Sequence, residues 1–460
     1  MDEATCFFRG GCAFHGALWT AASIEGLTPV VHSNAGCVAQ AFLAARASGI
    51  GLADWLQIPS TRAIERHVVF GGGSRLREQI KNTVKIIEAR LYGVIHGCES
   101  AMVGDDIPGL TKEAVEATHR VICSLVCGLH GDSRLGYSRA MADFVAAAGD
   151  FKDKIKLSSA LGPESPPRVN ILGVVPVTDL NYRGDLLEIA RLLEGLGVRA
   201  NIFFGPLEGV EELVNAGDAD LSLIFSKWGQ AAARKLLELH TVPLAQLPSM
   251  PLGFKGLKTL SEILTQNLQA GPWGQGAEAF LQSEQLKLEY LLEPLNQFRG
   301  EILGAPVALV GDESLLAGLA GFLRDELGAE IVLAIITEPL SDDEASGDDL
   351  ANGEDLPSSP QFQALSEFSA QVVRTSDSAE IERLIAQTRP LIILGGEPEK
   401  VLAEKYGTGH LTVSFPGRQI VLGRTYVGIN GAAALAEAYV SQILAALDLN
   451  EENLDLGLKT

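Results

Sequence analysis

The sequence predicts an α/β protein made of three doubly wound, Rossmann-like domains with parallel sheets. Short apolar runs alternate along the chain with amphipathic stretches of helical length, which is typical of strand and helix units in parallel sheets. The 460 residues are too many for one hydrophobic core. With 47% hydrophobic and 20% charged residues, the chain can bury large sheets. We expect domains at residues 1–160, 170–300 and 301–460.

The first domain is expected to contain three strands. The run LTPVVH from Leu27 predicts a strand followed by a helix. The segment HVVF (67–70) predicts a second strand, followed by a glycine turn at 71–73 and an amphipathic helix. The run YGVIH predicts the third strand. The glycines lack the G-K-S/T ending of a phosphate loop, which favours a tight turn or a close backbone approach over nucleotide binding.

Two carboxylates follow the third strand in the segment VGDDIPG. Asp105 and Asp106 have the chemistry of metal ligands or of acid–base catalysts. The position before a helix favours the simpler interpretation, in which they cap the helix and anchor neighbouring backbone amides.

The later domains follow the same pattern. The Ser- and Pro-rich stretch 157–169 predicts a linker, and VNILGVVPV then opens the second series of strands and helices. A third series begins near Pro306 and ends in C-terminal helices. Residues 341–360 contain seven acids and no base, which indicates a solvated surface loop or, less simply, a docking surface.

Charge and hydropathy exclude two classes of partner. A net charge of −22 is unsuited to nucleic-acid binding, which needs clustered Lys and Arg. No apolar run is long enough to cross a membrane, and the N-terminus lacks the order of a signal peptide. We expect a cytoplasmic protein whose six cysteines are reduced thiols.

Cys12, Cys37 and Cys98 lie in the motifs C-x-x-x-G-A, H-x-x-x-G-C and C-x-x-x-x-x-G-D-D. They are too far apart in the chain for a local metal knuckle, so tertiary structure must gather them at strand ends or loops. Such a set suits a large soft-metal cluster better than one zinc ion. For Cys123 and Cys127, in an apolar run, we expect core packing. Cys6 is interpreted as a terminal thiol, with an extra ligand as the alternative.

These motifs, in this order and at these distances, resemble component 1 of the nitrogenase superfamily. The likeness is densest over residues 10–140 and continues to the segment RTYVGINGAAALAEAYV. It implies an iron–sulfur cluster, P-cluster-like [8Fe-7S] or [4Fe-4S], held by Cys12, Cys37 and Cys98 and shared with a homologous alpha subunit. Ser133, 35 residues after Cys98 in D-S-R-L-G-Y-S, resembles a serine that the beta subunit offers to this cluster; the alternative is an ordinary turn hydroxyl.

The resemblance also suggests the subunit type. In the family the alpha subunit holds the substrate-reducing cofactor through a cysteine and a histidine. Here Ser226 stands near the place of that cysteine, and no cysteine follows Cys127. His410 alone is interpreted as structural. We therefore expect a beta-type subunit with no catalytic residue of its own, which relays electrons within an α2β2 heterotetramer from an ATP-dependent iron–sulfur reductase.

The substrate is left open between dinitrogen and a methylthio-alkane. Cys12 stands close to the start of the sequence, which favours alternative nitrogenases, nitrogenase-like reductases such as methylthio-alkane reductase, and assembly scaffolds over the molybdenum enzyme. The protochlorophyllide reductase branch lacks the G-D-D motif. A scaffold for cofactor assembly and a non-redox α/β metal-binding protein remain as alternatives.

Overall fold

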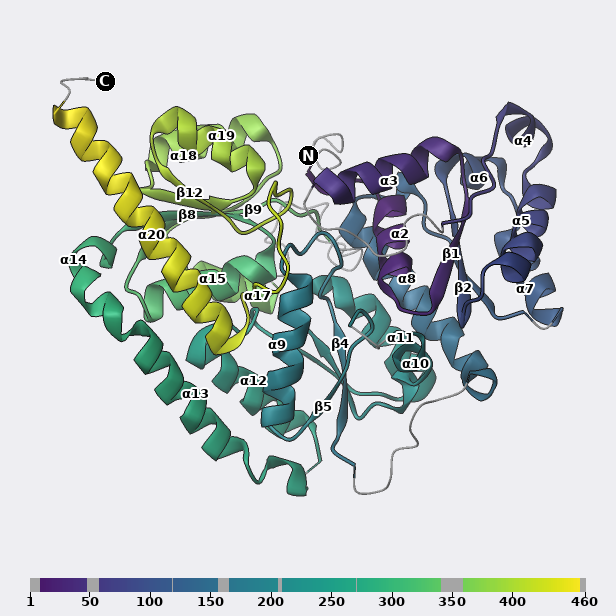
Figure 1. The fold of residues 1–460 in the computed structure, drawn as a ribbon, viewed down its shortest axis with the longest axis horizontal. Coiled ribbons are helices and arrows are strands. Elements are labelled where there is room, and N and C mark those ends of the chain that lie inside the picture. The colour runs from purple at the N-terminus through teal and green to yellow at the C-terminus, as the bar shows by residue number, and fades with distance from the viewer. Residues whose placement is uncertain are drawn as a thin grey trace, which may run out of the picture. The chain divides into compact units, whose positions relative to one another are not determined.

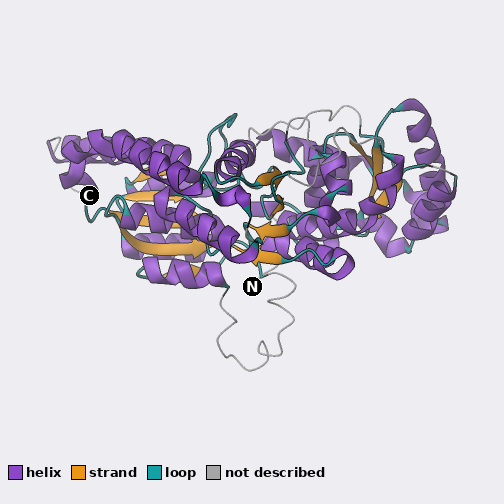
Figure 2. Ribbon diagram, turned by 90° about the horizontal axis from the view of Figure 1, so that it is seen from below, coloured by secondary structure: helices purple, strands orange, loops and turns teal. Residues whose placement is uncertain are grey.

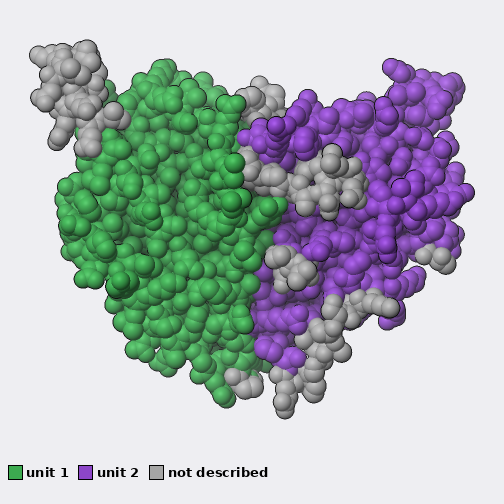
Figure 3. Space-filling model, in the orientation of Figure 1, with its two compact units in different colours: residues 1–9, 179–197, 246–460 green, residues 10–178, 198–245 purple. Residues whose placement is uncertain are grey.

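The computed structural model describes residues 9–47, 58–117, 119–155, 165–205, 209–269, 271–340 and 359–455. It contains three sheets and divides into two compact units (Figure 3). Unit 1 comprises residues 1–9, 179–197 and 246–460, and unit 2 comprises residues 10–178 and 198–245. The predicted α/β class with parallel, Rossmann-like sheets is confirmed, whereas the division into three domains stays a prediction.

The first sheet of unit 2 has the strand order β1-β2-β3, and both pairings are parallel. Its strands are β1 (Leu27–His32), β2 (Leu91–His96) and β3 (Val121–Ser124). The surrounding α-helices, labelled in Figure 1, are α2 (Ala13–Ser23), α3 (Ala35–Ala47), α4 (Glu65–Phe70), α5 (Gly73–Ile86), α6 (Cys98–Val103), α7 (Ile107–Glu116) and α8 (Ser133–Ala148). Two short 3-10 helices, η2 (Gly128–His130) and η3 (Gly149–Lys154), precede and follow α8 in the chain. Every residue of β2 is buried, as expected for a central strand.

The apolar side chains predicted for the helix after the glycine turn do face this sheet. Leu76 and Ile80 of α5 are buried in one cluster with Val30, Tyr92 and Val94 of the strands. Their helical spacing places them on one face, so the hydrophobic period of the sequence fixes how α5 packs.

The strand predicted at HVVF is wrong, because these residues form the end of helix α4. No residue of α4 is buried, and Val69 and Phe70 are 72% and 86% exposed. The sheet continues from β1 to β2 and β3 without this segment. A lone strand would leave its backbone groups unpaired, whereas a helix pairs them within the segment.

The second sheet has the order β5-β4-β6-β7, with β4 parallel to both β5 and β6. Its strands are β4 (Arg168–Leu172), β5 (Arg199–Asn201), β6 (Leu221–Ile224) and β7 (Leu244–Gln246), and its neighbours in the chain are α9 (Tyr182–Gly195), α10 (Val210–Val214), η4 (Ala216–Asp218), η5 (Lys227–Gly229) and α11 (Gln230–His240). The strand order reverses direction between β4 and β6, so this is a doubly wound sheet.

The third sheet, in unit 1, has the order β10-β9-β8-β11-β12 with parallel pairings throughout. Its strands are β8 (Pro306–Gly311), β9 (Glu330–Ile336), β10 (Val372–Arg374), β11 (Ile392–Gly395) and β12 (Gly409–Thr412). The helices of this unit are α12 (Gly253–Asn267), η6 (Pro272–Gly274), α13 (Ala277–Leu292), η7 (Glu293–Phe298), α14 (Arg299–Ile302), α15 (Glu313–Asp325), α17 (Pro360–Phe368), α18 (Ser378–Thr388), α19 (Glu397–Tyr406) and α20 (Gly428–Asp455). Figure 2 shows helices on both faces of this sheet.

Two glycines allow α2 to cross α8 with backbone against backbone. A Cβ on Gly16 would lie 2.6 Å from the carbonyl carbon of Ser133, and a Cβ on Gly136 would lie 2.8 Å from the carbonyl carbon of Ala13. Any side chain at either position would therefore push the helices apart. The turn predicted around Ser133 is wrong, because Ser133 is the first residue of α8 and Gly136 lies within the helix.

Some sequence-based predictions fall outside the described residues. Cys6 lies there, as do most of the predicted linker and residues 341–358 of the acidic stretch. Among the residues that the structure describes, none of the helices combines the length and the apolar character that a bilayer crossing requires.

Candidate metal centre

The carboxyl edge of the first sheet gathers cysteines from three successive loops. Cys37 lies in the first turn of α3 after β1, Cys98 is the first residue of α6 after β2, and Cys127 directly precedes η2 after β3. Because these strands are adjacent and parallel, their carboxyl ends share one edge, where open parallel sheets place their ligands. The structure therefore explains how distant cysteines come together.

Cys12 reaches the same place from another element. It is the N-cap residue of α2, and its backbone forms an isolated antiparallel bridge with Asp132, the N-cap of α8. Backbone amides of Phe14 and His15 donate to its sulfur, which lowers the pKa of the thiol, but burial has the larger effect and raises it. The neighbouring Cys37 also raises this pKa, so the two predicted ligands are close enough to interact electrostatically.

Gly128 shows directly that the sulfur atoms of Cys12 and Cys98 are close. A Cβ built on this glycine would lie 3.0 Å from Sγ of Cys98 and 3.1 Å from Sγ of Cys12. The two sulfur atoms are therefore no more than about 6 Å apart. The pKa of Cys98 is raised to about 11, chiefly by burial and also by the neighbouring Cys127, Cys12 and Cys37, although the amide of Gly128 acts to lower it.

This donor set suits a multi-iron cluster. Within the described ranges, no three Cys, His, Asp or Glu side chains lie close enough to hold one metal ion. In an iron–sulfur cluster each thiolate binds its own iron, so the ligands stand further apart than around a single ion. All of these thiols lie at helix N-termini, where the partial positive charge of the backbone amides favours a thiolate.

A carboxylate ties the loop of Cys37 to the helix of Cys98. Glu99 accepts hydrogen bonds from the backbone amide of Asn34 and from Oγ of Ser33 at 3.0 Å. The side chain of Asn34 in turn accepts from the backbone amide of Cys37 at 3.1 Å. These hydrogen bonds to Glu99 and Asn34 thus fix the position of the Cys37 loop relative to the start of the Cys98 helix.

The G-D-D carboxylates act as anchors, and that interpretation is confirmed. Asp106 caps α7 by accepting from the amide of Gly109 at 2.9 Å. Asp105 accepts from the amide of Gly72 at 2.8 Å and pairs with Nε2 of the buried His32 at 2.9 Å. Burial lowers the pKa of His32, and Asp105 opposes this effect. The triple glycine is thus a tight turn against His32 and Asp105.

Cys123 is half-buried and Cys127 is buried, but the two thiols have different neighbours. Cys123 packs against the core cluster of the first sheet, as predicted for a core thiol. Cys127 is 2% exposed, in agreement with the predicted burial, but its neighbourhood includes the thiol of Cys98. Sequence analysis missed this relation. The available indication was its position just after a strand, which matches that of Cys98.

The hydroxyl groups and the histidine singled out earlier have protein partners. Ser133 is fully buried, and its Oγ donates to the carbonyl of Gly10. Oγ of Ser226, which follows β6, donates to the carbonyl of Gly173 at 2.6 Å. Nε2 of His410 lies 3.0 Å from the carbonyl of Gly396, and burial lowers its pKa. Whether Ser133 ligates a cluster stays a prediction.

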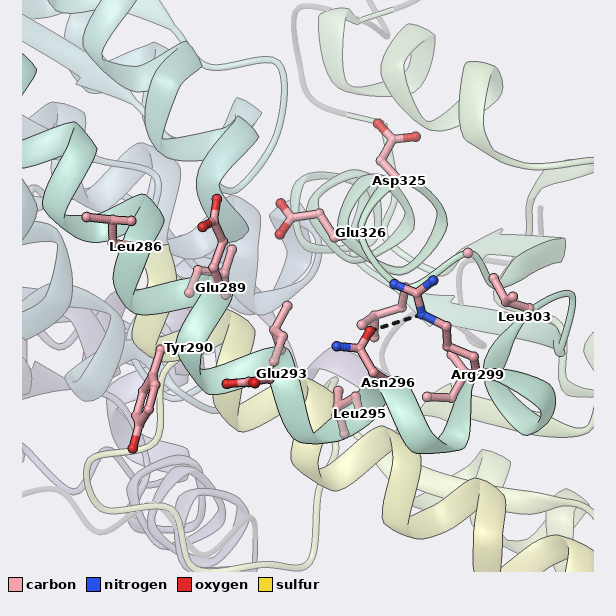
Figure 4. A pocket seen from close by; sticks show the side chains of 15 residues that line it. Leu286, Glu289, Tyr290, Glu293, Leu295, Asn296, Arg299, Leu303, Asp325 and Glu326 are labelled. Carbon is pink, nitrogen blue, oxygen red and sulfur yellow. Dashed lines mark hydrogen bonds between the residues drawn. The ribbon is translucent and has the colours of Figure 1, made fainter.

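A groove in unit 1 offers different chemistry. It has a volume of about 900 Å³ and is lined by α13, η7, α14 and the end of α15. Figure 4 shows Glu289, Glu293 and Glu326 around it, with Nε of Arg299 donating to Asn296 at 3.0 Å. No cysteine or histidine lines the groove.

The parallel α/β fold brings thiols, the ligands that soft metals prefer, to one edge of its first sheet. Comparison with known families then shows that the chain belongs to the family described as nitrogenase component 1 type oxidoreductase, which matches residues 12–444. The matched segment begins at Cys12 and includes every predicted ligand.

Individual relatives have different names. The chain is 26% identical over 419 residues to a nitrogenase molybdenum-iron protein alpha chain of Methanothermobacter marburgensis, covering 87% of this chain and 82% of that protein. It is 23% identical over 447 residues to the nitrogenase iron-molybdenum cofactor biosynthesis protein NifE of Nostoc sp., covering 95% and 84%. It is 23% identical over 480 residues to a nitrogenase iron-iron protein beta chain of Rhodobacter capsulatus, covering 95% and 93%.

A solved structure has the same fold. The structure titled "Nitrogenase Cp1 at pH 6.5" matches with a TM-score of 0.73 at 19% identity, covering 95% of this chain and 93% of that one.

Proposed function

We propose that this chain is the beta-type subunit of a nitrogenase-like oxidoreductase, in which Cys12, Cys37 and Cys98 bind an iron–sulfur cluster shared with a homologous alpha subunit. The convergence of these thiols at one edge of the first sheet is the observation that carries the proposal. When bound, such a cluster supplies one-electron transfer, here from an ATP-dependent iron–sulfur reductase towards the active site in the alpha subunit.

The surroundings of the thiols influence how readily each thiol loses its proton, which it must do to bind a metal. Backbone amides of Phe14, His15 and Gly128 donate to sulfur and stabilise the thiolate form. Burial acts in the opposite direction and raises the pKa of Cys12 and Cys98. Cys12 and Cys98 of the metal-free chain are thus protonated at neutral pH, and binding of iron to them is coupled to release of their protons.

Exposed apolar side chains flank the thiols in the sequence and support an interface there. Leu125 and Leu129 on either side of Cys127 are 47% and 64% exposed, and Met102, four residues after Cys98, is 78% exposed. Where exposed apolar side chains form one contiguous patch, that patch normally marks contact with another protein. The partner we propose is the alpha subunit, in an α2β2 heterotetramer.

The beta-type assignment depends on what this chain offers beyond its first 127 residues. Where the resemblance places the thiol of the alpha subunit, this chain has Ser226 or no counterpart, and the hydroxyl of Ser226 donates to the carbonyl of Gly173. His410 is bound to Gly396. We therefore place the substrate, dinitrogen or a methylthio-alkane, in the partner chain and assign no catalytic residue here.

A scaffold that assembles a cofactor is the second candidate, and the similarity to NifE of Nostoc sp. favours it. Both functions use the same thiols. They differ in whether the complex, supplied with reductase and ATP, reduces a substrate or only releases a matured cofactor. Substrate reduction would exclude the scaffold.

The proposal is tested by changing one predicted ligand and one core thiol. In the copurified complex, Cys37→Ala should lower the iron content and abolish electron transfer from the reductase. Cys123→Ala is the matched control, because Cys123 packs against the core of the same sheet and should leave both unchanged. Full iron content and an unaltered iron–sulfur spectrum in Cys37→Ala would rule out the assignment.

A further inference from the structure

Cys127 occupies a place equivalent to that of Cys98. Cys98 begins α6 two residues after β2 ends, and Cys127 precedes η2 three residues after β3 ends. The two strands are paired in parallel, with Ile95 opposite Ser124, so both cysteines leave the sheet at the same edge. The topology alone thus brings the fourth thiol to the predicted site.

The residue after Cys127 touches the other ligands. Gly128 presents its Cα side to the sulfur atoms of Cys98 and Cys12, 3.0 Å and 3.1 Å from where a Cβ would stand. Its backbone amide donates to the sulfur of Cys98. The backbone directly after Cys127 thus lies against two ligand sulfurs, and the thiol of Cys127 is near enough to act on the thiol of Cys98.

The contrast with Cys123 argues against simple core packing of Cys127. Cys123 belongs to the apolar cluster of the sheet, and the polar groups acting on it are Thr111 and Asp143. Cys127, in turn, is the first of the neighbouring thiols that act on Cys98, ahead of Cys12 and Cys37. Two cysteines four residues apart therefore face different surroundings.

We infer that Cys127 is a fourth thiolate ligand, beside Cys12, Cys37 and Cys98, of a [4Fe-4S] cluster at the carboxyl edge of the first sheet. On binding, the S–H proton of Cys127 passes to solvent and a sulfur–iron bond forms in place of a ligand supplied by water or by the partner subunit. The inference rests on the proposed function, but it changes what the partner has to contribute.

The test uses the full chain in its copurified complex, loaded anaerobically with ferric iron, sulfide and a thiol reductant. Cys127→Ser should lower iron by about a quarter or more, as expected when one of four irons loses its thiolate, and should change the electron paramagnetic resonance signal of the reduced cluster. Cys123→Ser is the control and should match the unaltered chain in both measurements. Iron content and resonance signal unchanged in Cys127→Ser would overturn the inference.

Two further comparisons separate the possible failures. If Cys12→Ser and Cys98→Ser lower the iron content while Cys127→Ser does not, the fourth ligand is wrong and the proposed function stands. If none of the three lowers it, the proposed function itself fails. Circular dichroism of the iron-free chain checks folding. If both Cys127→Ser and Cys127→Ala lose the fold there, Cys127 is a packing residue and the inference is overturned.

Discussion

Replacing Gly16 by alanine should displace a predicted ligand without removing any thiol. Gly16 is the glycine of the motif C-x-x-x-G-A, four residues after Cys12, and lies where α2 meets the start of α8. The new Cβ would stand 2.6 Å and 2.8 Å from the carbonyl carbon and Cα of Ser133. Carbon atoms in contact are normally about 3.5 to 4.0 Å apart, so α2 must move by about 1 Å.

The expected cost follows from overpacking, which destabilises by about 1 to 3 kcal/mol. For a unit of this size each kcal/mol lowers the melting temperature by about 2 to 4 °C, so we expect a decrease of about 2 to 12 °C. Because Cys12 is the N-cap of α2, it moves with the helix. Iron content of the loaded complex should therefore fall although every cysteine remains.

Gly300→Ala is the matched control. Gly300 lies in α14, and a Cβ there would meet no atom within 4 Å. Alanine is the better helix former, so this change should leave the melting temperature and the iron content unaltered or slightly higher. The reasoning is refuted if Gly16→Ala melts within about 1 °C of the unaltered chain and takes up full iron.

Three further outcomes are expected. Ser226→Ala and His410→Ala should leave substrate range unchanged in turnover assays with a fixed reductase, because both side chains bind backbone carbonyls; loss of substrate reduction in His410→Ala with normal cluster reduction would place the active site in this chain. Expressed without its partner, the chain should self-associate in sedimentation, because Leu129 and Met102 are exposed beside the thiols; an iron-free, well-behaved monomer would count against this. Burial raises the pKa of the Asp185 carboxyl to about 7, so the folded chain retains a proton that the unfolded chain loses. The free energy of unfolding should therefore fall by as much as about 4 kcal/mol as the pH rises from 4 to 7, and then level off. In Asp185→Asn this part of the pH dependence of thermal unfolding should vanish.

Local sequence patterns were enough to predict the fold class. The alternation of apolar runs and amphipathic helices predicted parallel sheets, because side-chain period and strand length depend on residues close in the chain. Helix α5 illustrates this, since Leu76 and Ile80 face the core as their spacing predicts. The carboxylates of the G-D-D motif were also predictable, because Asp106 caps a helix that begins at the next residue.

Tertiary structure decided the composition of the thiol site. HVVF has strand propensity, yet it forms the end of helix α4 and pairs with none of the strands in the described part of the chain. Cys123 and Cys127 lie in one apolar run of the sequence and cannot be distinguished by it. Strand β3 ends at Ser124, so Cys123 is within the strand as a core thiol, whereas Cys127 follows the strand and lies near Cys98. Gly16 needs to be glycine because of a helix more than a hundred residues later. These features depend on contacts between distant segments, which no local pattern contains.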